Sequence, residues 1–138
     1  MLVVYDENLT PIVGQIRTSC DGHLGGSQIK KIYVRNDNPL HYYTSVTIAP
    51  QMYDLGDWGE FGLTGWGVKL LAGDRQPSEA EWNTVHSSDT LQLVDIGEPG
   101  VADTSYYPVW IKVSVPGGTP AQIRENVRLR VSAIERLV

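Results

Sequence analysis

The chain has 138 residues, and its 11 Lys and Arg against 16 Asp and Glu give a formal charge of −5. At this length we expect one domain that buries about two-thirds of its unfolded surface, enough to fold without a metal or disulfide. The negative balance argues against non-specific nucleic-acid binding, and no apolar run reaches the roughly 20 residues that span a bilayer.

The first 24 residues show weak strand patterning, with short candidates at residues 2–5 and 12–16. They lack the basic start and long apolar stretch of a secretion signal. Cys20 is the single cysteine and cannot form an internal disulfide, so the simplest interpretation is a reducing compartment. We interpret residues 1–24 as an N-terminal arm or first weak strands, and residues 25–138 as a β-sandwich domain. An arm would add a strand to the sheet of a neighbour.

Short strands are predicted at residues 30–35, 42–49, 66–71 and 90–94, because apolar and polar side chains alternate along them. The residues expected to face a core are Ile32, Val34, Val46, Ile48, Leu91 and Leu93. The Asn-Asp-Asn-Pro sequence at 36–39 ends the first of these strands, since Asn and Asp favour turns and Pro has no N–H to donate.

One short helix is predicted near residues 78–86. Ser78 can cap its free N–H groups and Glu81, three residues later, can return the hydrogen bond, which makes a capping box. Pro77 can pack on Trp82 as a hydrophobic staple. We expect a connector of about two turns that ends near Val85 or the residue after it, with Trp82 plugging the core.

The clearest alternation lies near the C-terminus. The odd-numbered residues are apolar from Tyr107 to Val115, and again from Val127 to Ala133. The Pro- and Gly-rich residues 116–120 cannot continue either strand. We therefore expect an antiparallel pair joined by a loop of about ten residues. With the earlier strands this predicts an all-β, antiparallel sandwich of about seven or eight strands.

No motif indicates catalysis. The three His residues are far apart and lack zinc-binding spacing. Cys20 lies near His23, but loop residues three apart rarely hold the geometry of a nucleophile and its base. Asp54, Asp57 and Glu60 could offer Ca²⁺ three carboxylates, although their spacing is not that of a calcium loop and solvated turn acids are commoner. We expect no enzyme, no cofactor and no metal.

The aromatic residues indicate possible contact sites more clearly than any residue indicates catalysis. Trp58, Phe61 and Trp66 fall within the Gly-rich residues 56–67, where they either close one end of the sandwich or form a subunit contact or sugar-stacking platform. Trp66 is in phase with the apolar face of its strand, so we assign it to closure. For Trp58 and Phe61 both alternatives stay open.

Trp110 is out of phase with the inward residues of its strand. It is therefore covered either by another segment of this chain or by a partner, because large apolar groups are seldom left exposed. We expect Arg128 and Arg130 to share that outer face, with Lys112 beside them. They form either a solvated face or an electrostatic rim around Trp110.

Six segments, spread along residues 25–133, resemble parts of known proteins. They are residues 25–37 (GGSQIKKIYVRND), 42–50 (YYTSVTIAP), 65–70 (GWGVKL), 76–82 (QPSEAEW), 102–105 (ADTS) and 108–116 (PVWIKVSVP). Together they resemble immunoglobulin-like β-sandwich modules in structural proteins of tailed bacteriophages. The resemblance implies a building block without catalytic residues. Such modules sit on capsids as decoration or cement proteins, or in tails, necks and baseplates.

We therefore expect a non-enzymatic virion component, made in the host cytoplasm, that forms a homo-oligomer and binds other virion proteins, with no nucleic acid and no membrane as partner. Surface and edge-strand contacts would make the assembly, and the candidate interface residues are Trp58, Phe61, Trp110, Arg128 and Arg130. The alternative is a carbohydrate- or receptor-binding module that uses the loop aromatics. An enzyme would require a cleft with convergent polar groups.

Overall fold

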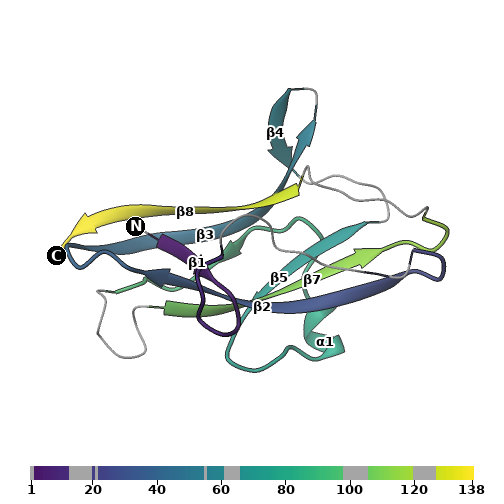
Figure 1. The fold of residues 1–138 in the computed structure, drawn as a ribbon, viewed down its shortest axis with the longest axis horizontal. Helices are drawn as coiled ribbons and strands as arrows, with labels where there is room; N and C mark the ends of the chain where they lie inside the picture. The colour runs from purple at the N-terminus through teal and green to yellow at the C-terminus, as the bar shows by residue number, and fades with distance from the viewer. Residues whose placement is uncertain are drawn as a thin grey trace.

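The computed structural model describes residues 2–12, 20, 22–54, 56–60, 66–97, 106–119 and 127–138. Within these ranges the chain forms two antiparallel sheets and one short helix (Figure 1). The elements are β1 (Leu2–Tyr5), β2 (Gly26–Asn36), β3 (His41–Asp54), β4 (Asp57–Glu60), β5 (Gly67–Ala72), α1 (Glu79–Trp82), β6 (Leu91–Gln92), β7 (Tyr106–Val115) and β8 (Val127–Leu137). The predicted all-β sandwich is confirmed.

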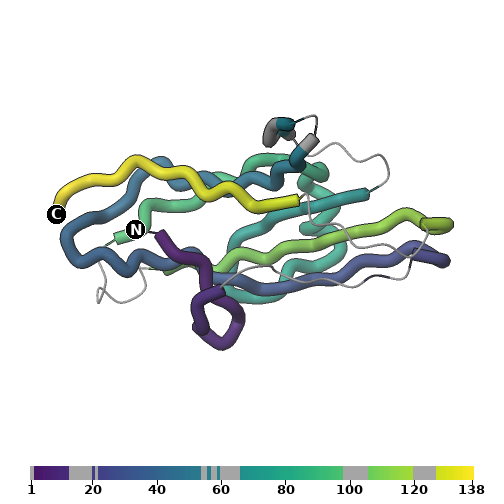
Figure 2. The backbone as a smooth tube through the Cα atoms, turned by 45° about the horizontal axis from the view of Figure 1, so that its top comes forward, coloured from purple at the N-terminus to yellow at the C-terminus, as the bar shows by residue number. Residues whose placement is uncertain are grey.

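The first sheet has the strand order β1-β2-β7-β5, and the second is built around β3. Ile48 of β3 pairs with both Leu91 of β6 and Val131 of β8, so β6 and β8 lie on opposite sides of β3. In Figures 1 and 2, β8 follows the outer edge of the second sheet, and the two chain ends lie at the same end of the molecule.

The core lies between the sheets and is apolar. Its buried members are Ile32, Val34, Tyr43, Val46, Ile48, Val68, Leu70, Leu93, Ile96, Val109 and Ile111. Leu91 is only partly buried but packs against them. The inward residues predicted for the four short strands are therefore confirmed.

The predicted pairing of the last two strands is wrong. β7 lies between β2 and β5 in the first sheet, whereas β8 pairs with β3 in the second. Each strand has one apolar face, and strands in opposite sheets can bury these faces against each other. Val109 and Ile111 of β7 belong to the core cluster, and Leu129 of β8 packs against that cluster. The residues between the strands are enough to cross the roughly 10 Å that separates packed sheets.

β2 ends as predicted, at a buried polar residue. Asn36 is fully buried, and its Nδ2 donates to the carbonyl oxygens of His41 at 2.7 Å and Gly97 at 2.9 Å. Its Oδ1 accepts a hydrogen bond from the Asn38 N–H at 2.8 Å. These bonds satisfy the buried amide and fix the turn between β2 and β3, because an unpaired polar group inside a core is costly.

β3 contains a β-bulge that the alternation did not reveal. Tyr43 and Val46 are both buried, although residues three apart point to opposite faces of a regular strand. The pairing with β8 shifts between Thr44 and Thr47, and Ser45 has a φ of 51°, in the left-handed region. The extra residue thus lets both ends of β3 present their apolar side chains to the same core.

The predicted capping box of α1 is present. Ser78 Oγ accepts a hydrogen bond from the Glu81 N–H at 3.3 Å, and a Glu81 carboxylate oxygen accepts one from the Ser78 N–H at 3.2 Å. The hydrogen bond from the Ser78 N–H lowers the pKa of the Glu81 carboxyl, and the hydrogen bond from Arg75 lowers it further. The helix ends at Trp82, earlier than predicted, because the next N–H groups form tight turns, such as Thr84 N–H to the Glu81 oxygen.

The predicted burial of Trp82 is confirmed, but the residue packs on the outer face of the first sheet and not between the two sheets. Its side chain is 1% exposed, but it lies outside the core cluster. Instead it covers the outer face of the first sheet: Lys112 Nζ lies 5.9 Å from its ring centroid, and Lys69 Nζ donates to its carbonyl oxygen at 3.2 Å. Helix α1 therefore seals β5 and β7 from outside.

The bulge predicts an inverted order of stability at position 45. In a regular strand Val is more stable than Gly, but a β-branched residue at positive φ is strained. We expect Ser45→Gly to be more stable than Ser45→Val by about 2 kcal/mol, measured by urea unfolding. A more stable Val variant would contradict the bulge.

Candidate assembly surface

The outer face of the first sheet alternates aromatic and cationic side chains. Lys31 Nζ lies 5.0 Å from the Tyr33 ring centroid and 5.3 Å from that of Trp110. The Tyr33 ring meets Tyr106 edge-on, with centroids 5.7 Å apart. Pairing between β2 and β7 places Lys31 opposite Trp110 and brings these rings together. The face is thus stabilised by contacts within the chain.

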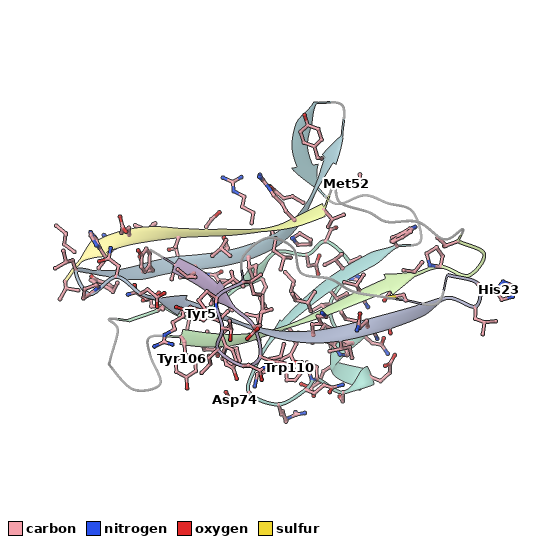
Figure 3. The ribbon with its side chains drawn as sticks, viewed as in Figure 1. Tyr5, His23, Met52, Asp74, Tyr106 and Trp110 are labelled. Carbon is pink, nitrogen blue, oxygen red and sulfur yellow. The ribbon has the colours of Figure 1, made fainter. Side chains whose placement is uncertain are left out.

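Trp110 points away from the core, as predicted, and its own chain covers it in part. Its Nε1 donates to the Gly73 carbonyl oxygen at 2.9 Å, and Lys31 Nζ donates to the Asp74 carbonyl oxygen at 3.3 Å. The loop after β5 therefore lies against Trp110 (Figure 3). A shallow cavity of about 150 Å³ lies in this region, lined by Gly73, Asp74, Tyr106, Tyr107 and Pro108.

The first strand is joined to its own sandwich. Residues 2–5 pair with β2, and the Tyr5 hydroxyl donates to the Asp37 carboxylate, which raises the pKa of Tyr5. Arg35 lies 5.4 Å from the Tyr5 ring centroid and 3.7 Å from the Asp37 carboxylate. This part of residues 1–24 is thus an edge strand. Residues 13–19 lie outside the described residues, and contact of an arm with a neighbour stays a prediction.

Arg128 and Arg130 do not share a face with Trp110, and that prediction is wrong. They lie on β8 in the second sheet, whereas Trp110 lies on β7 in the first. Arg128 Nε donates to Gln51 Oε1 of β3 at 2.9 Å. Because the inner faces of the sheets meet in the core, their outer faces lie on opposite sides of the molecule. The arginines therefore form a separate surface.

β8 is the long edge strand of the second sheet. Among the described residues it pairs only with β3, which leaves its other side open; we call this open side the β8 edge. Ile134 is 48% exposed and Leu137 is 76% exposed. An open strand presents unpaired N–H and C=O groups to another chain, and apolar residues beside them favour association.

A groove lies beside the β8 edge. It has a volume of about 350 Å³ and is lined by Leu2, Tyr43, Val131, Ala133 and Glu135, so it runs between β1 and β8. The Tyr43 hydroxyl donates to Glu135 Oε1 at 2.7 Å and ties β3 to β8. Burial raises the pKa of Tyr43 to about 12, and the hydrogen bond to the Glu135 carboxylate is the second-largest cause of this rise. The interface candidates chosen from sequence did not include this groove.

The loop aromatics have different positions. Trp66 is half-buried and packs against the core cluster, so its assignment to closure is confirmed and it does not form an exposed platform. Trp58 belongs to β4, but its side chain lies outside what the structure describes, as does the whole of Phe61. Their interface role, like the calcium interpretation of the neighbouring acids, stays a prediction.

Cys20 is half-buried rather than exposed as a nucleophile. Its Sγ donates to the Val113 carbonyl oxygen at 3.6 Å, and burial raises the pKa of the thiol, partly offset by the backbone of Gln28. A raised pKa disfavours the thiolate that nucleophilic chemistry needs. The described residues include no group of three or more His, Cys, Asp or Glu placed to hold a metal ion.

Comparisons with family models, with curated proteins and with solved structures each gave no match. In the part of the chain that the structure describes, no helix has the length and apolar character needed to cross a membrane. We therefore infer function from the contacts and exposed surfaces of this chain.

The raised pKa of Tyr43 predicts that the protein loses free energy of unfolding at high pH. Folding favours its neutral hydroxyl, so this contribution is fully present below the ordinary pKa of 10.0 and is lost as pH rises to about 12. We expect wild type to lose more free energy of unfolding between these pH values than Tyr43→Phe. Urea titrations at both ends of the window measure this difference, and equal losses would contradict the prediction.

Proposed function

We propose that the chain is a non-enzymatic structural subunit of a bacteriophage virion. It is an immunoglobulin-like β-sandwich that binds other virion proteins, as capsid decoration or cement or in a tail, neck or baseplate. The observation that carries this proposal is the β8 edge, an 11-residue strand that pairs on one side only among the described residues. Such an edge is a template for pairing with another chain.

Two further features support an assembly role. The exposed apolar residues Ile134 and Leu137 lie on the same strand as the open edge, and Leu40, also exposed, accepts a hydrogen bond from the Val138 N–H at 3.0 Å beside them. A particle presents many copies of each protein, so contacts that are weak singly become strong together. The resemblance of six sequence segments to phage sandwich modules points to the same class.

The direct test is the composition of phage particles. Particles purified from a lysate of cells that carry the gene are analysed by quantitative mass spectrometry. We expect the chain at a fixed number of copies per particle that salt washing does not remove. Particles that lack the chain, from cells that contain it in soluble form, would overturn the proposal.

A pair of edge variants tests the role of β8. Val131→Lys places a charge on the inward side of the β8 edge, a substitution that blocks strand addition. Val4→Lys is the matched change on β1, because Val4 also faces inward and packs against the core cluster. We expect Val131→Lys to lower incorporation into particles on the order of tenfold and Val4→Lys to change it by less than about twofold. Melting temperatures show that both variants fold. Equal incorporation of both would remove β8 from the assembly contact.

A further inference from the structure

We propose that β8 pairs antiparallel with β8 of a second copy of this chain, about a two-fold axis that passes beside Val131. The inference rests on the proposed function, because it names the partner of the same edge. It follows from how charged and apolar residues are distributed along the strand.

Symmetry limits the possible registers. A two-fold axis that relates two edge strands of one continuous sheet is perpendicular to the sheet and passes between a residue and its own copy. Each residue then opposes one at the same distance on the other side of the axis, and the two side chains share a face. On β8 the outer face carries the even-numbered residues, such as Arg128 beside Gln51, and the inner face carries the odd-numbered ones, such as Leu129.

The arginines on the outer face select among these registers. An axis at Ser132 would place Arg128 opposite Arg136, and an axis at Ala133 would place Arg130 opposite Arg136. An axis at Leu129 would place Arg128 opposite Arg130, and an axis at Arg130 would place that residue opposite itself. Like charges directly opposite each other destabilise a strand pair. All four registers are therefore disfavoured.

An axis at Val131 avoids every such pair. Arg128 then opposes Ile134 of the second copy, and Arg130 opposes Ser132. This register pairs residues 127–135 of both strands. An axis at Ile134 also avoids like charges but pairs only residues 131–137, so it makes fewer backbone hydrogen bonds. The longest register free of opposed arginines is the one centred on Val131.

The apolar residues fit the same register. The aliphatic stem of Arg128 would cover Ile134, which is 48% exposed in the single chain. On the inner face, Leu129 opposes Ala133 and Val131 opposes its own copy. Val131 and Ala133 line the groove between β8 and β1, so the second copy would close the groove with apolar side chains.

Disulfide trapping tests the register. In a full-length Cys20→Ala background, Val131→Cys places two thiols opposite each other across the axis, whereas Ile134→Cys keeps them far apart. We expect mild oxidation to convert most of the Val131→Cys protein to a covalent dimer and less than about a tenth of the Ile134→Cys protein. A higher yield from Ile134→Cys would overturn the register, and so would the absence of dimer from both.

A second pair of variants needs no substitution inside the groove. At exposed position 134, Glu would face Arg128 of the second copy, and Lys would repel it. We expect Ile134→Glu to have a dimer dissociation constant about tenfold or more below that of Ile134→Lys, measured by sedimentation equilibrium at two salt concentrations. Equal constants, or the reverse order, would overturn the inference.

The two proposals fail in different ways. If the purified chain stays monomeric at high concentration but Val131→Lys still blocks incorporation into particles, the β8 edge binds another virion protein and only the inference of a second copy is overturned. If the chain dimerises in the Val131 register but is absent from particles, the inference stands and the proposed function is overturned.

Discussion

The structure depends on one constraint: each long strand has one apolar face, and each such face needs another to cover it. β7 and β8 carry the most regular alternation in the chain, and they meet this constraint from opposite sheets. The bulge at Ser45 keeps both ends of β3 facing the same core, so that one continuous strand can hold β4, β6 and β8. The open side of β8 results from this arrangement, because β8 is the outermost strand of its sheet among the residues that the structure describes.

The outer face of the first sheet and the β8 edge of the second sheet differ in what covers them. Lys31, the loop after β5 and helix α1 cover the outer face of the first sheet, and Trp110 and Trp82 are bound there by the chain itself. The second sheet ends in a strand whose outer side has no strand beside it among the described residues. Contacts with other molecules are therefore expected at β8 rather than around Trp110.

Local sequence patterns predicted the features that depend on neighbouring residues, namely the positions of strands and the start of the helix. Alternation located β2, β5 and β7, and the Ser78–Glu81 pair located the start of α1. Strand pairing was not predictable in the same way, since an apolar face shows only that a strand is covered and not by which sheet. A connection of about ten residues between β7 and β8, longer than most hairpin loops, was the signal that they lie in different sheets. The wrong prediction that Arg128 and Trp110 share a face follows from this one error in strand pairing. The groove beside β8 depends on how the two sheet edges face each other, which no single segment encodes.

Backbone amide exchange along β8 tests the account most directly. On an antiparallel edge strand, alternate amides bond to the neighbouring strand and the others face solvent. At low protein concentration, residue-resolved hydrogen exchange should show alternating protection along β8, with the set facing β3 slow. At high concentration the second set should become slow as well. Protection of both sets at every concentration would show that the edge is already covered, and a second set that stays fast at high concentration would show that no second copy pairs with it.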